Sequence, residues 1–319
     1  MAAGTLPAMS AGHGETPLVS VGFPVFNEEE HLPRALDSIL GQDYEHLEVI
    51  VCDNASTDRT VEIAREYERR DPRVTLHRNE RNEGSVANFN RCFELASGPY
   101  FTWASGHDER LPAAIRRCVE VLEEDPRVVL CYPRALWHRF DGSTEPVEGD
   151  TIETRGLSQA ARLRKTVEEL GNCNAVHGVI RSPALARTRL ARRCHGADTV
   201  LLAELSLLGG FHQLDERLFV RTENRPPEEE AEEERIPRIL DHIGVTKGLG
   251  RSRPYSVMVV EHMKGAWHVS EGLGKPANAL RVPVYCWRNW HRRLKEEWHV
   301  PANVRGSLRG RARRLLRAG

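Results

Sequence analysis

One short segment constrains the fold of this chain more than any other. In LEVIVCDNASTDRT, residues 47–60, an apolar run ends abruptly at Cys52-Asp53, and a small polar turn then leads into a segment with helical spacing. This pattern is typical of a buried strand that carries a carboxylate to the edge of a sheet, where open α/β sheets bind their ligands. The same residues could also form only a turn with a helix cap from Ser56 or Asp58.

An earlier segment repeats the pattern. LVSVGFPVFNE, residues 18–28, runs into Pro24, which a central strand does not accommodate, and then into polar Asn27-Glu28. Apolar residues at helical spacing follow over residues 31–40. The order strand, loop, helix therefore occurs twice in succession, which is a βαβα start.

The alternation continues and predicts an α/β fold, with a mostly parallel central sheet and helices on both faces. Further strands are expected over residues 73–78, 100–104, 127–132 and 175–180, and a final strand pair or edge over 211–221. Helices are expected after Ser85, after Pro112, over residues 157–170, and from Asp198 to the Gly209-Gly210 pair.

The composition changes near residue 225 and divides the chain. Pro226-Pro227 and a glutamate run follow, and beyond them short helical segments carry tryptophans and arginines. We therefore expect a flexible N-terminus over residues 1–16, a main domain over 17–225 and a mainly helical C-terminal extension over 226–319. The chain has 319 residues, 40% of them hydrophobic, which is enough for a large core.

Charge and targeting signals narrow the class of protein. A net charge of -1 and the lack of a recognised motif argue against nucleic-acid binding. The first residues have neither the cationic start nor the apolar centre of a secretory signal, so a cytoplasmic location is expected. Seven scattered cysteines show no zinc spacing and are expected to be buried thiols.

Three acids are predicted to lie along one edge of the sheet: Asp53, Asp108 after the fourth strand, and Asp198 at a later helix start. Acids that meet in this way can divide base recognition, metal binding and proton abstraction between them.

The ordered motifs around these acids resemble those of the family 2 glycosyltransferases, inverting enzymes of the GT-A fold that use nucleotide sugars. The resemblance covers residues 17–225. It is carried by PVFNEEEHL, VIVCDNASTDRT, NEGSVANFN, YFTWASGHDERLP and GADTVLLAELSLLGG. It implies transfer of a sugar from a UDP- or dTDP-type donor to the hydroxyl of a glycan, lipid-linked or small-molecule acceptor. The oligomeric state stays open.

The resemblance also implies roles for single residues. Asp53 would accept a hydrogen bond from the base, which fits a uracil or thymine ring because each offers one N–H donor. The remaining nucleotide contacts would come from Pro24, Val25, Asn27, Glu28, Asn82, Gly84 and Asn88.

The metal motif departs from the family pattern. Many relatives have Asp-x-Asp-Asp where this chain has Ser105-Gly106-His107-Asp108. Asp108 is the expected ligand of Mg²⁺ or Mn²⁺, with the substrate supplying other ligands. His107 could assist, since imidazole suits Mn²⁺ better, or it could be a hydrogen-bonded loop residue. The lost acids leave an alternative function open, a catalytically altered sugar-nucleotide-binding or scaffold protein.

Asp198 matches the catalytic acid of the family. Its implied role is the general base that deprotonates the acceptor hydroxyl, and a helix N-terminus helps to keep such a carboxylate ionised. The simpler interpretation is a helix N-cap. His177 and Arg221 are further candidates, for the acceptor pocket and for a phosphate respectively.

The C-terminal extension has two interpretations. Its arginines and tryptophans between Arg281 and Arg317 could lie on anionic lipid, which would suit a peripheral location at the inner face of a membrane. They could equally form a solvated basic face whose tryptophans pack onto the main domain, and this second interpretation is the one favoured from the sequence. A dehydrogenase is disfavoured because no GxGxxG follows the first strand.

Overall fold

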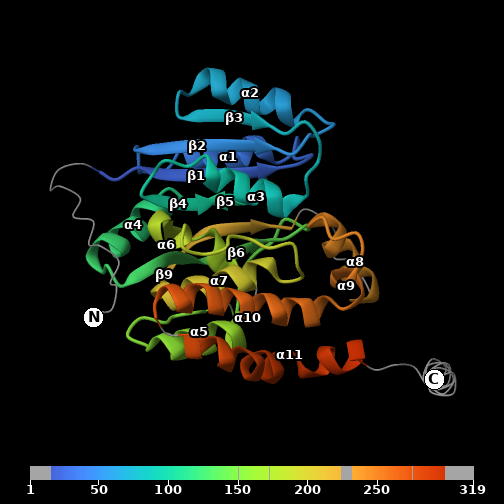
Figure 1. Ribbon diagram of the computed structural model, residues 1–319. Helices are drawn as coiled ribbons and strands as arrows, with labels where there is room; N and C mark the ends of the chain where they lie inside the picture. The colour runs from blue at the N-terminus through green and yellow to red at the C-terminus, as the bar shows by residue number, and fades with distance from the viewer. Residues whose placement is uncertain (1–15, 150, 172, 224–231, 275, 299–319) are drawn as a thin grey trace, which may run out of the picture.

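The strands form one curled sheet with helices around it. The structure, a computed structural model, describes residues 16–149, 151–171, 173–223, 232–274 and 276–298 (Figure 1). Its strands are β1 (Val19–Val25), β2 (Leu47–Asp53), β3 (Val74–Arg78), β4 (Tyr100–Trp103), β5 (Glu109–Arg110), β6 (Val128–His138), β7 (Thr144–Pro146), β8 (Val179–Arg181) and β9 (Gly210–Thr222). Their order is β3-β2-β1-β4-β8-β6-β9-β5, with β7 paired to β6.

Strand direction decides where the polar loops meet. β1, β2, β3 and β4 are mutually parallel, and β8 is antiparallel to both β4 and β6. β6 therefore runs in the same direction as β4, and β9 is parallel to β6. β5 and β7 are antiparallel additions. The expected mixed α/β fold with a mostly parallel sheet is thus confirmed.

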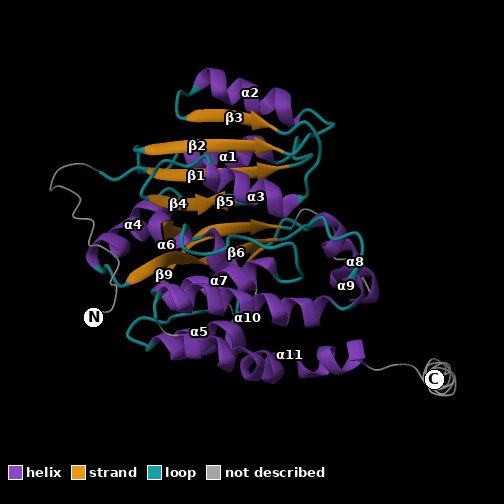
Figure 2. Ribbon diagram, viewed as in Figure 1, coloured by secondary structure: helices purple, strands orange, loops and turns teal. Residues whose placement is uncertain are grey.

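Helices cover both faces of this sheet (Figure 2). α1, α2 and α4 share one buried cluster with the inward residues of β1, and α3, α6 and α7 share another with β4. The helices before β9 are α1 (Leu32–Leu40), α2 (Thr60–Arg70), α3 (Ser85–Glu94), α4 (Ala114–Glu124), α5 (Gln159–Glu169), the 3₁₀ helix η1 (Asn174–His177), α6 (Ser182–Leu185) and α7 (Ala197–Leu208).

Two predictions for the second half of the sheet were wrong in detail. Residues 175–180 are not one strand: η1 ends at His177, and only Val179–Arg181 form β8. A short apolar run does not distinguish a helical turn from a strand, and here the chain turns at Cys173, whose φ is 56°. Residues 211–221 belong to the single long strand β9, which lies between β6 and β5.

The C-terminal extension is helical over the residues described, as expected. It contains α8 (Glu232–His242), α9 (Leu249–Ser252), α10 (Pro254–Gly272), the 3₁₀ helix η2 (Pro276–Arg281) and α11 (Val282–Trp298). The expected boundary at residue 225 and the N-terminal residues 1–15 lie outside the described part of the chain, as do residues 299–319.

α10 joins the extension to the main domain. α7 is mostly apolar and is buried from Val200 to Leu207, because the sheet covers one side of it and α5 and α10 cover the other. Arg189 links the two parts through ion pairs with Glu204 of α7 and Glu261 of α10.

Two expectations drawn from composition can be compared with the structure. All seven cysteines are buried and free, as predicted for structural thiols. Among the helices described, none combines the length and the apolar character needed to span a bilayer.

Candidate active site

The directions of the strands bring the predicted site residues to one edge of the sheet. Asp53 ends β2 and Asp108 follows β4, so both lie at the carboxyl edge. Arg221 reaches this edge near the end of β9, and His177 reaches it from the start of antiparallel β8. α7 leads into the start of β9 at the opposite edge, so its first turn, with Asp198, returns to the carboxyl edge.

The loops after β1 and β2 are fastened to each other. The Asn27 backbone N–H donates to Ser56 Oγ at 2.9 Å, and the Asn27 Oδ1 accepts from the Thr57 N–H at 2.9 Å. The Glu28 N–H donates to Thr60 Oγ1 at 2.8 Å. Asn27 has a φ of 55°, which asparagine adopts more readily than most residues. The predicted contact Asn27 is therefore exposed on a rim held by hydrogen bonds.

The other predicted contacts on β1 lie below this rim. Pro24 is half-buried and Val25 is buried within the sheet. Asp58 accepts the Thr60 backbone N–H at 3.0 Å, so the helix-cap interpretation of the second loop also describes a real contact.

Asp53 is buried at the base of the second loop. Its side chain is 0% exposed, its Oδ2 accepts the Ser56 backbone N–H at 3.1 Å, and the Arg78 Nε lies 3.4 Å from Oδ2. The Arg78 side chain is 50% exposed and covers Asp53 from outside. Because this carboxylate has no exposed surface, contact with a base would require a neighbouring group to move.

An asparagine network joins the ends of β2 and β3 to α3. The Asn79 Nδ2 donates to the Oδ1 atoms of Asn54 and Asn88 at 3.0 and 3.1 Å. Asn54 donates to Asn82 Oδ1, and Asn82 Oδ1 accepts from the Gly84 N–H. Asn88, 2% exposed, donates to the Cys52 carbonyl at 2.7 Å.

The network therefore links Asn82, Gly84 and Asn88 to one another, and Asn88 is buried inside the protein. Sequence reasoning missed Asn54 and Asn79. The signal that could have found them was the clustering of amide side chains directly after two strand ends.

The altered motif after β4, residues 105–108, packs against Glu28 in the loop after β1. The His107 Nδ1 lies 3.1 Å from the Glu28 Oε1, and a Cβ on Gly106 would lie 2.8 Å from the Glu28 Cγ. A residue larger than glycine at position 106 would therefore displace Glu28. Burial lowers the pKa of His107, but its hydrogen bond with Glu28 and the charge of Asp108 outweigh burial and raise the pKa overall.

Asp108 lies directly beside this pair and is 7% exposed. Its Oδ1 accepts the Thr222 backbone N–H at 2.9 Å, which ties the motif to the end of β9. Within the described residues, no group of three or more His, Cys, Asp or Glu side chains is arranged to hold a metal ion. Any metal here needs ligands from a substrate.

His177 and Arg221 border the same region. Burial lowers the pKa of His177 to about 4, so its ring is neutral near pH 7, and its Nδ1 lies 3.3 Å from the Trp103 carbonyl. The guanidinium of Arg221 lies over the Trp137 ring, 4.4 Å from its centroid, and donates to Asn174 Oδ1 at 3.1 Å.

Sequence reasoning also missed Arg110. This residue is 6% exposed and donates to the carbonyls of Trp103 and His177 at 2.8 and 2.6 Å. It fastens η1 to the end of β4. Burial lowers its pKa to about 10, so it remains charged near pH 7. A single arginine two residues after an acid carries no signal in the sequence that would indicate this role.

Asp198 is half-buried in the first turn of α7. Its Oδ1 accepts the Thr199 backbone N–H at 2.9 Å. The N-cap of α7 is Gly196, with a φ of 66°, and not Asp198. The carboxylate therefore lies in the first turn of α7, near the positive end of the helix dipole.

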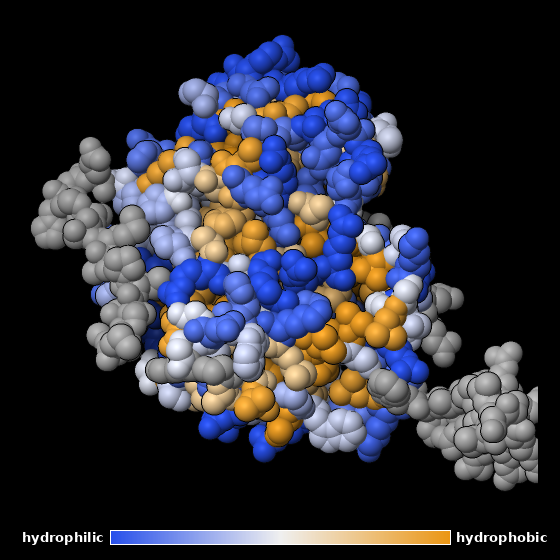
Figure 3. Space-filling model, in the orientation of Figure 1, coloured by the Kyte–Doolittle hydropathy of each residue, from blue (hydrophilic) through white to orange (hydrophobic). Residues whose placement is uncertain are grey.

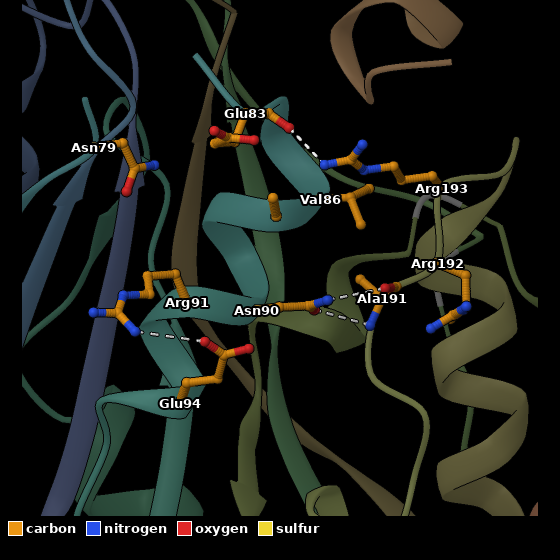
Figure 4. A pocket seen from close by; sticks show the side chains of 10 residues that line it. Asn79, Glu83, Val86, Asn90, Arg91, Glu94, Ala191, Arg192 and Arg193 are labelled. Atoms are coloured by element: carbon orange, nitrogen blue, oxygen red, sulfur yellow. Dashed lines mark hydrogen bonds and ion pairs between the residues drawn. The ribbon is translucent and has the colours of Figure 1, made fainter. Parts of the chain in front are cut away.

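A pocket of about 480 Å³ lies beside this edge, between α3 and residues 191–193 (Figure 4). Arg193 closes one end of it by donating to the Glu83 carbonyl at 2.9 Å, and Asn90 is held by hydrogen bonds to Ala191. Asn79 connects the pocket to the asparagine network, but none of Asp53, Asp108 and Asp198 lines it.

Comparison with known proteins gives a consistent result. The sequence model of the family described as glycosyl transferase family 2 matches residues 20–187. The putative glycosyltransferase EpsE of Bacillus subtilis (strain 168) is 37% identical over 109 residues, 34% of this chain and 39% of that protein. The chondroitin synthase of Escherichia coli is 31% identical over 123 residues, 39% of this chain and 18% of that protein. The similarity therefore spans less than half the length of these relatives.

Solved structures with the same fold include S. aureus TarS 1-349 in complex with UDP-GlcNAc. It has a TM-score of 0.54 at 15% identity, covering 83% of this chain and 73% of that one. The mannosyltransferase PcManGT from Pyrobaculum calidifontis, in complex with GDP-Man and Mn²⁺, has a TM-score of 0.52 at 16% identity, covering 95% and 81%. At these identities the likeness concerns the fold alone.

Proposed function

The chain belongs to glycosyl transferase family 2, and we propose that it is an inverting glycosyltransferase that moves a sugar from a nucleotide-diphosphate sugar to an acceptor hydroxyl. The observation that carries the proposal is the return of α7 to the carboxyl edge of the sheet. Through this return, Asp198 comes to the same edge as Asp53 and Asp108, from an element more than 80 residues further along the chain. The proposed donor is of the UDP or dTDP type.

Asp198 is the proposed general base. Its carboxylate accepts the proton of the acceptor hydroxyl while that oxygen attacks the anomeric carbon. The nucleoside diphosphate leaves from the opposite side, so the configuration of this carbon inverts. The half-buried position of Asp198 in the first turn of α7, at the same edge of the sheet as Asp53 and Asp108, supports the role.

The residues after β4 fit a divalent cation only in part. The Oδ1 atom of Asp108 accepts the Thr222 N–H, which leaves Oδ2 to bind the cation. The Nδ1 atom of His107 is hydrogen-bonded to Glu28, which leaves Nε2 of the same ring as the second atom that would bind the cation. Two protein ligands with the diphosphate and water completing the shell are typical of Mg²⁺ and Mn²⁺ sites. When bound, such a cation would offset the charge of the leaving diphosphate.

The base of the donor is proposed to reach Asp53. An ionised carboxylate only accepts hydrogen bonds, and a uracil or thymine ring has one N–H to donate. Because Arg78 covers this carboxylate, we infer that its half-exposed side chain moves aside as the nucleotide enters. Asn27 on the exposed rim and Asn82 in the neighbouring loop are placed to contact the rest of the nucleoside.

The test is turnover of UDP- and dTDP-sugars by Asp198→Asn. Transfer, or slow donor hydrolysis, should fall on the order of 10²- to 10⁴-fold while UDP affinity stays within about twofold. Asp215→Asn is the control, since its side chain is 93% exposed on β9. Unchanged turnover in Asp198→Asn would remove this residue from the role of base.

A second function is favoured by one observation, the replacement of the expected acids by Ser105 and His107. A sugar-nucleotide-binding or scaffold protein of the same fold would need no metal. Calorimetry with UDP, with and without Mn²⁺, separates the two. The scaffold would be favoured if UDP bound with the same affinity with and without Mn²⁺ and to Asp108→Asn, and if no sugar were transferred to any acceptor tried.

A further inference from the structure

A second surface of the molecule has a composition that the proposed reaction does not explain. It is the outer face of α10, η2 and α11, called here the tryptophan face. Its apolar members are large and exposed: Met263 at 37%, Trp267 at 48%, Leu280 at 72%, Val284 at 52% and Trp287 at 50%. Tryptophans are the side chains with the most to gain from burial, so their exposure on a folded helix pair requires a reason.

The two helices present these residues on one side. α10 and α11 are antiparallel, since Glu297 near the end of α11 accepts from the Tyr255 N–H at 2.6 Å, and the Trp290 ring stacks on His262 at 5.5 Å. Met263 and Trp267 are one helical turn apart, as are Val284 and Trp287 in the facing helix. In Figure 3, the lower part of the molecule, where α10 and α11 lie, shows hydrophobic patches interspersed with hydrophilic ones.

Other side chains form the buried core of the extension. Trp290 is partly buried and contacts the core cluster of α10 and α11, together with Tyr285 and Cys286. Trp267 and Trp287 are not among the residues of that cluster, and about half of each side chain is exposed. Trp290 thus packs as expected of the tryptophans, whereas half of the Trp287 side chain is exposed.

Positive charge predominates on the η2 and α11 side of this face, while α10 contributes the exposed Glu271. Residues 276–295 contain five cations and no acid: Arg281, Arg288, Arg292, Arg293 and Lys295. The Lys295 Nζ lies 5.6 Å from the centroid of the Trp287 ring, so a cation and an indole are presented together. Arg281, Arg292 and Lys295 are exposed, whereas Arg288 pairs with Glu168 of α5 at 3.2 Å.

We propose that the tryptophan face binds the surface of an anionic lipid bilayer. Indoles partition into the boundary between headgroups and acyl chains, and lysine and arginine beside them meet lipid phosphates. The charge complementarity argues for a bilayer: the exposed cations of η2 and α11, beside exposed indoles, suit a broad anionic surface. The inference is independent of the glycosyltransferase activity and stands or falls separately from it.

The test is sedimentation of the full chain with vesicles of phosphatidylglycerol and phosphatidylcholine, 30:70, against vesicles of phosphatidylcholine alone. The chain should sediment with the first, and high salt should weaken the binding. Trp267→Ala with Trp287→Ala should weaken it on the order of tenfold for each indole removed. Arg281→Gln and Lys295→Gln should each weaken it about fivefold.

The control is Phe140→Ala, an even more exposed aromatic (61%) in the turn between β6 and β7. It should bind as the wild type does. Wild-type affinity of the double tryptophan variant would overturn the proposal, because cations elsewhere in the chain would then account for binding. Failure of the wild type to sediment with anionic vesicles would overturn it as well. Thermal unfolding of each variant shows that its fold is intact.

Discussion

Replacement of Arg189 by methionine should destabilise the protein in a way that depends on pH. The guanidinium, 16% exposed, lies 2.8 Å from Glu204 Oε1 and 2.9 Å from Glu261 Oε2. Glu204 is 1% exposed, so without Arg189 its carboxylate would be buried with only the backbone N–H of residue 189, at 2.7 Å, to stabilise the charge.

The magnitude follows from that burial. Removal of one partner of a buried ion pair costs about 3–5 kcal/mol when the other partner stays charged. Burial already raises the pKa of Glu204 despite the opposing effect of Arg189, and the variant should raise it further. A raised pKa means that the folded state binds more protons than the unfolded state, so stability falls as pH rises through the window between the ordinary and the raised pKa.

Urea unfolding at pH 8 and pH 5 measures both effects. Arg189→Met should lose about 3–5 kcal/mol at pH 8, and roughly 1–2 kcal/mol at pH 5, where protonated Glu204 loses only hydrogen bonds. Adding Glu204→Gln should recover much of the loss at pH 8. The matched control is Arg192→Met, whose side chain is 49% exposed and 4.0 Å from Glu261. Losses that are equal for the two variants, or equal at the two pH values, would refute the reasoning.

Two further predictions concern α10. A Cβ at Gly265 would overlap the Glu204 Oε1 and lie 2.7 Å from its Cγ, so Gly265→Ala should lower the free energy of unfolding by about 1–3 kcal/mol. Gly272→Ala, with no atom within 4 Å of its Cβ position, should be neutral or stabilising, and equal urea midpoints for the two variants would contradict the prediction. Burial lowers the pKa of His262 to about 3, and neither ring nitrogen has a hydrogen-bond partner among the residues described. The unfolded state therefore binds more protons below about pH 6.5, and stability should fall with decreasing pH by up to about 1.4 kcal/mol per unit. His262→Phe should be at least as stable at pH 7 and should lose less stability between pH 7 and pH 5; an unchanged pH dependence would show that His262 is protonated in the fold.

The sequence predicted the first half of the fold well because the signals there are local. Apolar runs that end in polar residues gave β1 and β2, and helical spacing gave the helices that follow them. The same reasoning failed at residues 175–180, where a short apolar run forms a 3₁₀ turn and a three-residue strand. The structure of this segment depends on the pairing of β8 with β4 and β6, which are tens of residues away in the sequence.

The candidate site shows the same division. Ordered motifs indicated which residues come to the edge of the sheet, including Asp53, Asp108 and Asp198. They did not indicate that Arg78 covers Asp53, or that Glu28 fits against Gly106 and His107. Glu28 and His107 are 79 residues apart, and the residue pattern of neither segment indicates that the two side chains meet.

By itself, then, the sequence determined the alternation of strands and helices, the acids that follow the strands, and the helical character of the extension. Each of these depends on the spacing of residues within one segment. Only the tertiary structure decided that Asp53 is buried, that Arg189 joins Glu204 to Glu261, and that Trp290 packs while Trp267 and Trp287 remain exposed. Burial and pairing depend on which distant segments meet, and that is fixed by strand order and helix packing.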